Sequence, residues 1–355
     1  MVLKLFKQKS QSILGIDLSS TSVKILQISS SGDNFTVEGY ATLSLPENAM
    51  ESGIIKEVDF VANAIRQHLT MQRLSSKKAA ISVPDSSAIS KVIQVNEELN
   101  EQEMEELVIM EADKYIPYPI DEINIDFTVL GTSTKNSAML DVLIVASKAE
   151  NISNRIDVMN RAGLETKIVD VDSYAVERAA QLLTKDLPAS GENKNIAIID
   201  IGSVYTHLYV LHGMKIIYSR EEEFGGKQLI DLIVQQYGMK PEDAFAGLEQ
   251  NSLPEDFALR VQQPFNDMLL MQVKRTLQFF FSTSQYTFVD HIILAGGVAK
   301  QKGLTAFLQK GIEVPISTAN LFDSMEFLGS VDREKVLRDS PALMISCGLA
   351  LRQIE

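Results

Sequence analysis

The sequence predicts an α/β protein made of two similar halves, with an additional unit inserted into the first half. Two observations lead to this fold class. A strand, a turn rich in small or hydroxylated residues and a second strand occur twice, at residues 16–25 and 199–208, and each copy places an aspartate near the turn. Between and after the copies, runs with strand character alternate with runs of helical periodicity, which is typical of α/β proteins.

The composition is that of a globular protein with more than one domain. The chain has 355 residues, 45% of them hydrophobic, and a chain of this length exceeds one ordinary core. Its formal net charge of −14 argues against non-specific nucleic-acid binding, which needs clustered lysine and arginine. A single cysteine, Cys347, excludes an internal disulfide framework and suits a reducing compartment.

The amino-terminal residues 1–9 mix lysine with apolar residues. They lack the apolar core of a secretory signal, and no apolar run in the chain approaches the ~18 residues of a membrane span. A cytoplasmic protein is therefore expected. Basic and apolar leaders of this kind can also touch an anionic membrane surface, and that reading stays open beside an ordinary frayed terminus.

The first half contains the clearest helix signal of the chain. Asn100 followed by Glu103 is the pattern of a capping box, and Pro117 ends the helix. Apolar residues at helical spacing predict further helices at 58–69 and 151–161. Strands are expected at 35–41, 79–83, 123–129 and 139–146. Residues 77–161 are predicted to form a compact inserted unit of the size of a small domain.

A strand at 166–172 and a helix at 173–183 lead to the second half, after a linker rich in turn formers at 187–193. Helices are then expected after Gly226, over 255–284 with a bend at Pro264, from residue 304 and over 341–352. A strand is expected at 291–295.

The two hairpin turns are candidates for a triphosphate and magnesium site. Asp17 and Asp200 could accept hydrogen bonds from magnesium-bound waters, since magnesium keeps several waters and uses few carboxylates. The small turn residues let backbone N–H groups approach phosphate oxygens, and Lys24 could reach back as a point charge. Ordinary hairpin turns favour the same residue types, so either copy alone would be weak. Their recurrence favours the phosphate site.

Two glycine pairs and one aspartate extend this candidate site. Gly225-Gly226 precedes a predicted helix, and Gly296-Gly297 separates a strand from a helix, which suits a nucleotide lying against helix amino termini. Asp170 and Asp172 form an Asp-x-Asp pattern that could orient a water for phosphate hydrolysis or ligate a metal. Asp172 could also cap the helix that follows it.

The order of these motifs resembles the actin, Hsp70 and sugar-kinase ATPase superfamily. The first hairpin is similar to its phosphate-1 motif, Asp200, Gly202, Thr206 and His207 to phosphate-2, and residues 294–297 to the adenosine motif. The resemblance implies an actin-like, ribonuclease H-like fold with two duplicated halves around a nucleotide cleft that binds ATP or ADP with Mg²⁺. The nucleotide-contacting residues that it implies are Asp17, Ser19, Ser20, Thr21, Lys24, Asp200, Gly202, Ser203, Gly225, Gly226, Lys227, Gly296, Gly297 and Val298.

In the same superfamily, the resemblance places Asp17 and Asp200 at the metal through water, and Asp172 at the position of the water-orienting residue. Asp172 replaces actin's glutamine, and Ser203 stands where actin has a further carboxylate. ATP binding with slow or no hydrolysis is therefore expected.

Four segments, at residues 14–24, 111–117, 277–281 and 341–350, resemble the PilM family of type IV pilus assembly proteins over essentially the whole chain. That family implies four subdomains. Their expected ranges are 1–76 with 162–187 and 340–355 for subdomain 1A, 77–161 for the inserted subdomain 1C, 188–225 with 290–339 for subdomain 2A, and 226–289 for subdomain 2B.

The PilM resemblance also implies a partner. The short cytoplasmic amino-terminal peptide of PilN, an inner-membrane protein, is expected in the groove between subdomains 1A and 1C, with cytoplasmic pilus motor ATPases as further partners. The chain would then lie at the cytoplasmic face of the inner membrane and contact the membrane only through PilN. An FtsA-like cell-division protein and a small-molecule kinase of the same superfamily are the alternatives.

Overall fold

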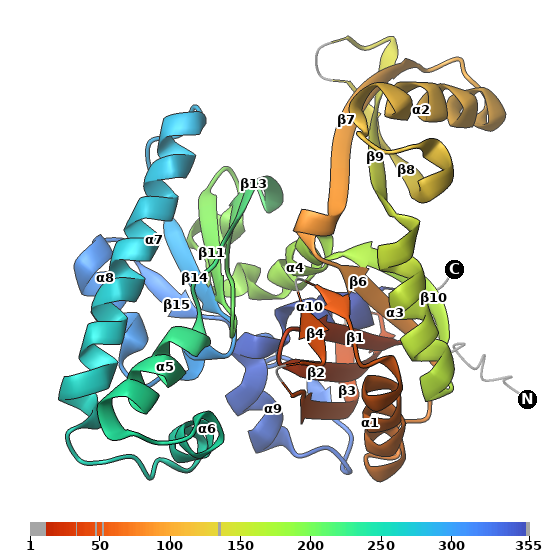
Figure 1. Cartoon of the computed structure of the whole chain (residues 1–355). Coiled ribbons are helices and arrows are strands. Elements are labelled where there is room, and N and C mark those ends of the chain that lie inside the picture. The colour runs from red at the N-terminus through yellow and green to blue at the C-terminus, as the bar shows by residue number, and fades with distance from the viewer. Residues whose placement is uncertain (1–11, 33, 47, 52, 134–135, 353–355) are drawn as a thin grey trace, which may run out of the picture.

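The computed structural model describes residues 12–352 except 33, 47, 52, 134 and 135. The described chain forms two halves, each built on one large mixed sheet, and a smaller unit that projects from the first half (Figure 1). None of the helices in these residues combines the length and apolarity that crossing a bilayer requires.

The first half is built on a six-stranded sheet with the order β10-β6-β1-β2-β3-β16. β1, β2 and β3 form an antiparallel meander, and β6 and β10 join it as parallel strands beside β1. The strands are β1 (Leu14–Ser19), β2 (Ser22–Ser31), β3 (Asn34–Ser44), β6 (Lys78–Val83), β10 (Glu165–Val171) and β16 (Glu326–Phe327). A separate two-stranded ribbon contains β4 (Met50–Glu51) and β5 (Ile54–Ile55).

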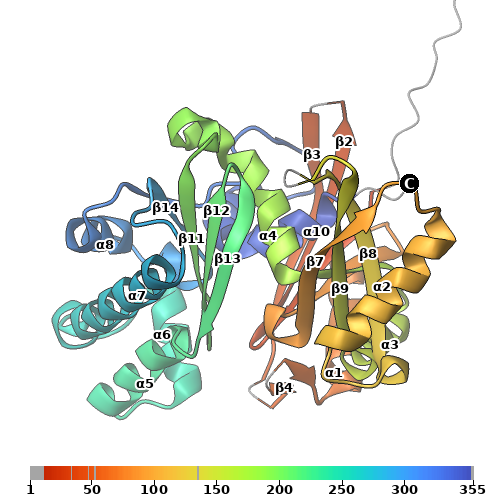
Figure 2. The same ribbon diagram turned by 90° about the horizontal axis from the view of Figure 1, so that it is seen from above.

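Helices cover both faces of this sheet. α1 (Val58–Met71) and α3 (Ala149–Ala162) bury their apolar sides in a core with β1, β2, β3 and β6. On the other face, α4 (Asp172–Ala180) and α10 (Met344–Ala350) lie between the sheets of the two halves (Figure 2). The core that they form therefore joins the halves.

The second half repeats the plan with a five-stranded sheet of the order β13-β12-β11-β14-β15. Its strands are β11 (Asn195–Ile201), β12 (Thr206–His212), β13 (Lys215–Glu222), β14 (His291–Ala295) and β15 (Ile316–Thr318). Its helices are α5 (Gly226–Tyr237), α6 (Pro241–Gln250), α7 (Gln263–Thr283), α8 (Leu304–Ile312) and α9 (Arg333–Asp339). The predicted bend falls at the start of α7, where a π-helical turn (Ala258–Gln262) precedes Pro264.

The projecting unit contains a three-stranded antiparallel sheet of the order β7-β9-β8, with one helix packed on one face. Its elements are β7 (Ala88–Asn96), α2 (Glu101–Tyr115), β8 (Ile123–Thr132) and β9 (Met139–Lys148). Asn100 and Glu103 form the predicted capping box, with the Glu103 N–H donating to the Asn100 side chain at 3.0 Å.

This unit is narrower than the expected range 77–161. β6, expected inside it, pairs with β1 and β10 in the large sheet, and α3 packs against α1. The apolar run of β6 is buried on both sides, as in a central parallel strand. A continuous apolar run predicts such a strand but does not say which sheet it joins.

Candidate nucleotide site

The first hairpin joins β1 and β2 through a two-residue turn, Ser20 and Thr21, because Ser19 pairs with Ser22. Asp17 lies directly opposite Lys24 in the ladder, and the Lys24 Nζ is 2.8 Å from Asp17 Oδ2. The same ammonium donates to Ser19 Oγ at 2.7 Å. The side chains of this pair are only 16% and 7% exposed, so the charges are largely withdrawn from solvent. In the structure the Lys24 ammonium thus lies at the turn, between Asp17 and Ser19.

The second hairpin joins β11 and β12 through a longer turn, residues 202–205, closed by a hydrogen bond from the Gly202 N–H to the Tyr205 carbonyl. Here Asp200 lies opposite His207. The His207 Nε2 is 2.8 Å from Glu221 Oε2 on β13. Burial alone would lower the pKa of His207, but the hydrogen bond to Glu221 and the charge of Asp200 raise it above its ordinary value.

The glycine pairs pack against the second turn. A Cβ on Gly225 would lie 2.6 Å from the Gly202 carbonyl oxygen, and one on Gly296 would lie 2.5 Å from Asp200 Oδ1. Gly296 also has a φ of +86°, which disfavours any side chain. Both positions therefore need glycine for close approach. Gly297, in contrast, has open space where a Cβ would lie.

The start of α5 differs from the expectation of N–H groups that face a ligand. The Gly226 N–H donates to the Gly202 carbonyl at 2.9 Å and the Lys227 N–H to the Ser203 carbonyl at 2.7 Å. The Gly225 N–H is taken by Gln228 Oε1 at 2.7 Å. The amides of Gly226 and Lys227 thus fix the shape of the second turn, and the amide of Gly225 is used within the start of α5.

The charges of the first hairpin act on the aspartate of the second. Burial raises the pKa of Asp200, the charges of His207 and Lys24 lower it, and the charge of Asp17 raises it. Coulomb interactions decline with distance and are screened by water. Asp17 and Lys24 of the first hairpin are therefore neighbours of Asp200 of the second.

The family model described as "Type IV pilus assembly protein PilM" matches residues 15–354. The chain belongs to the PilM family. It is similar to a solved structure titled "PilM-PilN type IV pilus biogenesis complex", with a TM-score of 0.79, 23% identity, and coverage of 97% of this chain and 99% of that chain. The ethanolamine utilization protein EutJ from Carboxydothermus hydrogenoformans is similar with a TM-score of 0.59, 15% identity, and coverage of 99% and 92%.

These findings confirm the actin-like fold. They identify the chain as a PilM-family protein rather than an FtsA-like cell-division protein or a small-molecule kinase. The doubled hairpin, the two sheets and the helices between them are therefore the actin-like framework of a type IV pilus assembly protein.

Asp172 of this PilM-family chain lies at the start of α4, where β10 ends beside β6. The pKa of Asp172 is raised to about 7, mainly by burial and also by the charges of Asp17 and Asp85, while a hydrogen bond to Ser82 and the charge of Arg155 oppose the rise. The capping interpretation is wrong, because Val171 is the N-cap residue and Asp172 is already in the first turn.

Asp170 and Asp172 do not form one metal site. Asp170 pairs with Arg178, whose guanidinium lies 3.1 Å from Asp170 Oδ2, whereas Asp172 interacts with Asp17 and Asp85. Among the described residues there is no group of three or more acidic, histidine or cysteine side chains that could hold a metal ion. A dedicated all-protein metal cage is thus absent from this part of the chain.

Three residues near the site were missed in the sequence. Arg155 on α3 is only 2% exposed, and its guanidinium donates to the Gly53 carbonyl at 2.9 Å and the Leu18 carbonyl at 3.5 Å. Burial lowers the pKa of Arg155, while Asp172 and Asp17 oppose this. One feature of the sequence could have indicated its burial. Its spacing from Val158 and Ala162 places all three residues on one face of α3.

The other two, Asp85 and Tyr209, link distant parts of the chain. The Tyr209 hydroxyl on β12 donates to Asp85 Oδ2 at 3.1 Å, and Asp85 begins the short helical turn that leads into β7. Burial and the charges of Asp85, Asp172 and Asp200 raise the pKa of the Tyr209 phenol well above its ordinary value. One buried hydroxyl therefore lies between the second hairpin and the root of the projecting unit.

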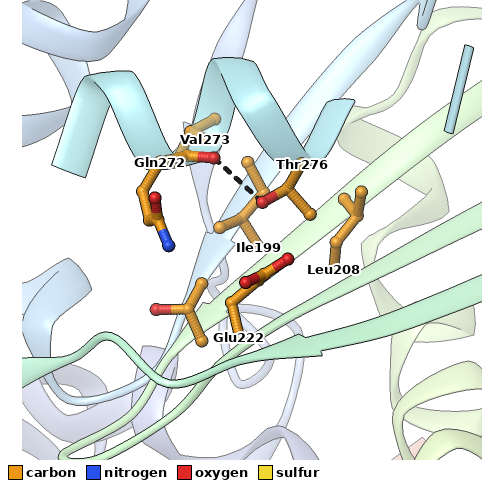
Figure 3. A pocket seen from close by; sticks show the side chains of 7 residues that line it. Ile199, Leu208, Glu222, Gln272, Val273 and Thr276 are labelled. Atoms are coloured by element: carbon orange, nitrogen blue, oxygen red, sulfur yellow. Dashed lines mark hydrogen bonds between the residues drawn. The ribbon is translucent and has the colours of Figure 1, made fainter. Parts of the chain in front are cut away.

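A small pocket between α7 and the second sheet does not coincide with the candidate site (Figure 3). Its lining residues are Ile199, Thr206, Leu208, Glu222, Gln272, Val273 and Thr276. The Thr276 hydroxyl donates to the Gln272 carbonyl within its own helix at 2.9 Å. None of the predicted nucleotide-contacting residues lines this pocket, which is a packing gap of the second half.

Proposed function

We propose that this chain is an ATP-binding scaffold of the type IV pilus assembly machinery. The observation that carries the proposal is the convergence of the two hairpins, which brings Asp17, Lys24 and Asp200 into one electrostatic neighbourhood. An ammonium beside two carboxylates at paired turns suits a triphosphate with its cation, because each charge of the ligand then meets an opposite charge.

The donor set fits magnesium bound through water. Mg²⁺ dehydrates reluctantly and uses one or two carboxylates with ligand phosphates and waters. Asp17 and Asp200 would hold those waters, in keeping with the absence of a larger ligand cluster among the described residues. The ion would neutralise phosphate charge.

Hydrolysis in this proposal is slow at most. Asp172 would orient a water, since burial gives it a pKa of about 7 and it can hold or release a proton near neutral pH. The same protonation equilibrium leaves a large fraction of the carboxyl neutral at pH 7, which weakens it as an acceptor for a water proton.

The proposed partner is the cytoplasmic amino-terminal peptide of PilN, bound in the groove between subdomains 1A and 1C. The similarity to a PilM–PilN complex supports this partner. Through it the chain would lie at the cytoplasmic face of the inner membrane and connect the membrane components to the pilus motor ATPases.

A structural route for coupling between the two ligands supports the proposal. Asp85 begins the connection into β7, and it accepts the hydrogen bond of Tyr209, which lies on the same strand as the second hairpin. A second contact, from the Tyr174 hydroxyl on α4 to Ser90 Oγ on β7 at 3.0 Å, joins α4, which lies between the two sheets, to the projecting unit. A movement of the second hairpin on nucleotide binding would thus be transmitted through the Tyr209–Asp85 hydrogen bond to the root of the projecting unit.

Calorimetric titration with ATP and Mg²⁺ tests the nucleotide site. The wild-type chain is expected to bind in a Mg²⁺-dependent manner, and D17A and D200A to lose most of the affinity. D267A removes an exposed aspartate of α7 and is the matched control, with affinity unchanged. Unchanged affinity in both hairpin variants would disprove the clamp.

Titration with a synthetic PilN amino-terminal peptide tests the partner separately. Binding with and without ATP measures the coupling, which must be reciprocal. No peptide binding in either state would remove the partner, and equal peptide affinity in both states would remove the coupling while leaving the nucleotide site intact.

A further inference from the structure

The outward side of α2 combines two exposed apolar side chains with acidic residues. Ile109 is 42% exposed and Met110 is 54% exposed, although both lie in the middle of a helix. Spacings of three and four residues place them on one face with their polar neighbours. This surface, called here the α2 outer face, comprises Gln102, Glu105, Glu106, Ile109, Met110 and Asp113.

The α2 outer face has no cover within the described chain. The buried side of α2, with Met104 and Val108, packs on the three-stranded sheet. Seen from above, α2 lies on the side of that sheet away from the second half (Figure 2). A helix that presents large apolar residues to solvent between acids is typical of a binding surface.

Most of the acidic charge of this face is uncompensated. Lys114 lies outside the defined face and forms an ion pair with Glu111, also outside it, at 2.6 Å. Within the face, Glu106 accepts one hydrogen bond, from Gln102 at 3.5 Å. Glu105 and Asp113 are exposed and have no basic partner among the described residues. The face therefore matches a segment that carries both positive charge and apolar side chains.

The chain contains a segment of this composition. Residues 1–11, which lie outside the described part, include three lysines, Lys4, Lys7 and Lys9, and no acid. Leu3, Leu5 and Phe6 supply apolar side chains for Ile109 and Met110. We propose that residues 1–11 of one copy of this chain dock on the α2 outer face of a second copy.

The topology favours a second copy over the same copy. β1 runs parallel to β6, and β6 leads at its carboxyl end toward the projecting unit, so Leu14, the first residue of β1, lies at the opposite end of the sheet. Eleven extended residues span at most about 40 Å. A segment that docked on its own copy would first have to run back along the length of β1, about 20 Å for its six residues, to reach the root of the projecting unit.

Such docking is head-to-tail, because the two contacting surfaces differ. Each copy offers one basic segment and one acidic helix face, so contacts of this kind add copies in an open chain or close into a ring. The contact does not involve the nucleotide site, and it goes beyond the proposed function.

The first experiment measures self-association of the full chain by sedimentation velocity. The wild type is expected to associate in 50 mM salt and to do so about fivefold more weakly in 300 mM salt, because exposed charge pairs are screened. K4E/K7E and E106K/M110S should each be monomeric under both conditions. D267K/M271S is the matched control, since it changes an exposed acid and an exposed methionine one turn apart on α7, and it should associate as the wild type does.

The second experiment titrates a labelled synthetic peptide of residues 1–11 into the full-length K4E/K7E chain, whose own segment no longer competes. Adding E106K/M110S to that chain should weaken peptide binding at least about tenfold, and adding D267K/M271S should not change it. A charge exchange completes the test: K4E/K7E and E106K/D113K copies, each monomeric alone, should associate when mixed.

Three results would overturn the proposal. One is equal affinity of the peptide for the chains with and without E106K/M110S. Another is a contact between residues 1–11 and α2 that persists when the protein is diluted, because the segment would then lie on its own copy. The third is sedimentation of the wild type, but not K4E/K7E, with phosphatidylglycerol vesicles while the peptide fails to bind the chain, because the segment would then recognise membrane.

Discussion

The two hairpins share one backbone plan but differ in how they manage the charge of their aspartate. In the first, Asp17 has its own counter-ion, Lys24, directly across the ladder at 2.8 Å. In the second, Asp200 faces His207, which pairs with Glu221, and Gly296 packs against the Asp200 carboxylate. Burial raises the pKa of Asp200. The comparison teaches that a repeated motif preserves the position of a carboxylate without preserving its electrostatic role.

The largest expected difference between the hairpins is in stability. D17A leaves the mostly buried Lys24 without its partner and should lower the free energy of unfolding by about 3 kcal/mol. D200A removes a carboxylate whose ionisation burial disfavours, and it should change stability by less than about 1 kcal/mol. Urea unfolding without nucleotide measures both. Equal losses of unfolding free energy would mean that Asp17 and Asp200 make the same electrostatic contribution to stability.

Nucleotide affinity, unlike stability, should depend on the two hairpins to a similar extent. D17N and D200N each remove the charge of one charge-assisted contact and should weaken ATP-Mg²⁺ binding by about 10- to 100-fold. Calorimetry at a fixed salt concentration measures this, with D267N as the control on the exposed side of α7. Loss of affinity in only one variant would restrict the cation site to that hairpin.

Asp172, the first residue of α4, should make stability depend on pH. Its folded pKa is about 7 against an ordinary value of 3.8, so its contribution is fully present below about pH 4 and is lost as pH rises through 7. After allowance for partial exposure, wild type should lose about 2 kcal/mol relative to D172N between pH 4 and 8. Urea unfolding of both chains at pH 4 and pH 8 measures the difference. A difference independent of pH would mean that Asp172 stays ionised in the folded chain.

The smallest expected effect concerns the link between the second hairpin and the projecting unit. Y209F removes the hydrogen bond to Asp85 and should cost about 1 kcal/mol of stability, with the aromatic packing kept. It should also reduce the effect of ATP on PilN-peptide affinity without abolishing either binding event. Y237F, which removes the hydrogen bond from the Tyr237 hydroxyl of α5 to Asp256, is the matched control variant and should leave the coupling unchanged. Full coupling in Y209F would exclude this hydroxyl as the route.

Local signals in the sequence predicted much of the fold and part of the site. The spacing of Asp17 and Lys24 placed them across a two-stranded ladder, since a short turn fixes the register of a hairpin. The capping box at Asn100 and the doubled hairpin were read in the same way and agree with the structure. The PilM family match rests on the whole chain and confirms the family that the sequence resembled.

What only the tertiary structure decided involves partners far apart in the chain. β6 joins the large sheet because its neighbours are β1 and β10, which no local pattern encodes. Arg155 and Tyr209 reach the site from α3 and β12, and their partners Leu18 and Asp85 lie more than 100 positions away in the chain. The amides of Gly226 and Lys227 hold a turn more than 20 residues earlier in the chain. Hydrogen bonds within a turn are set by neighbouring residues, whereas burial and charge coupling depend on which segments folding brings together.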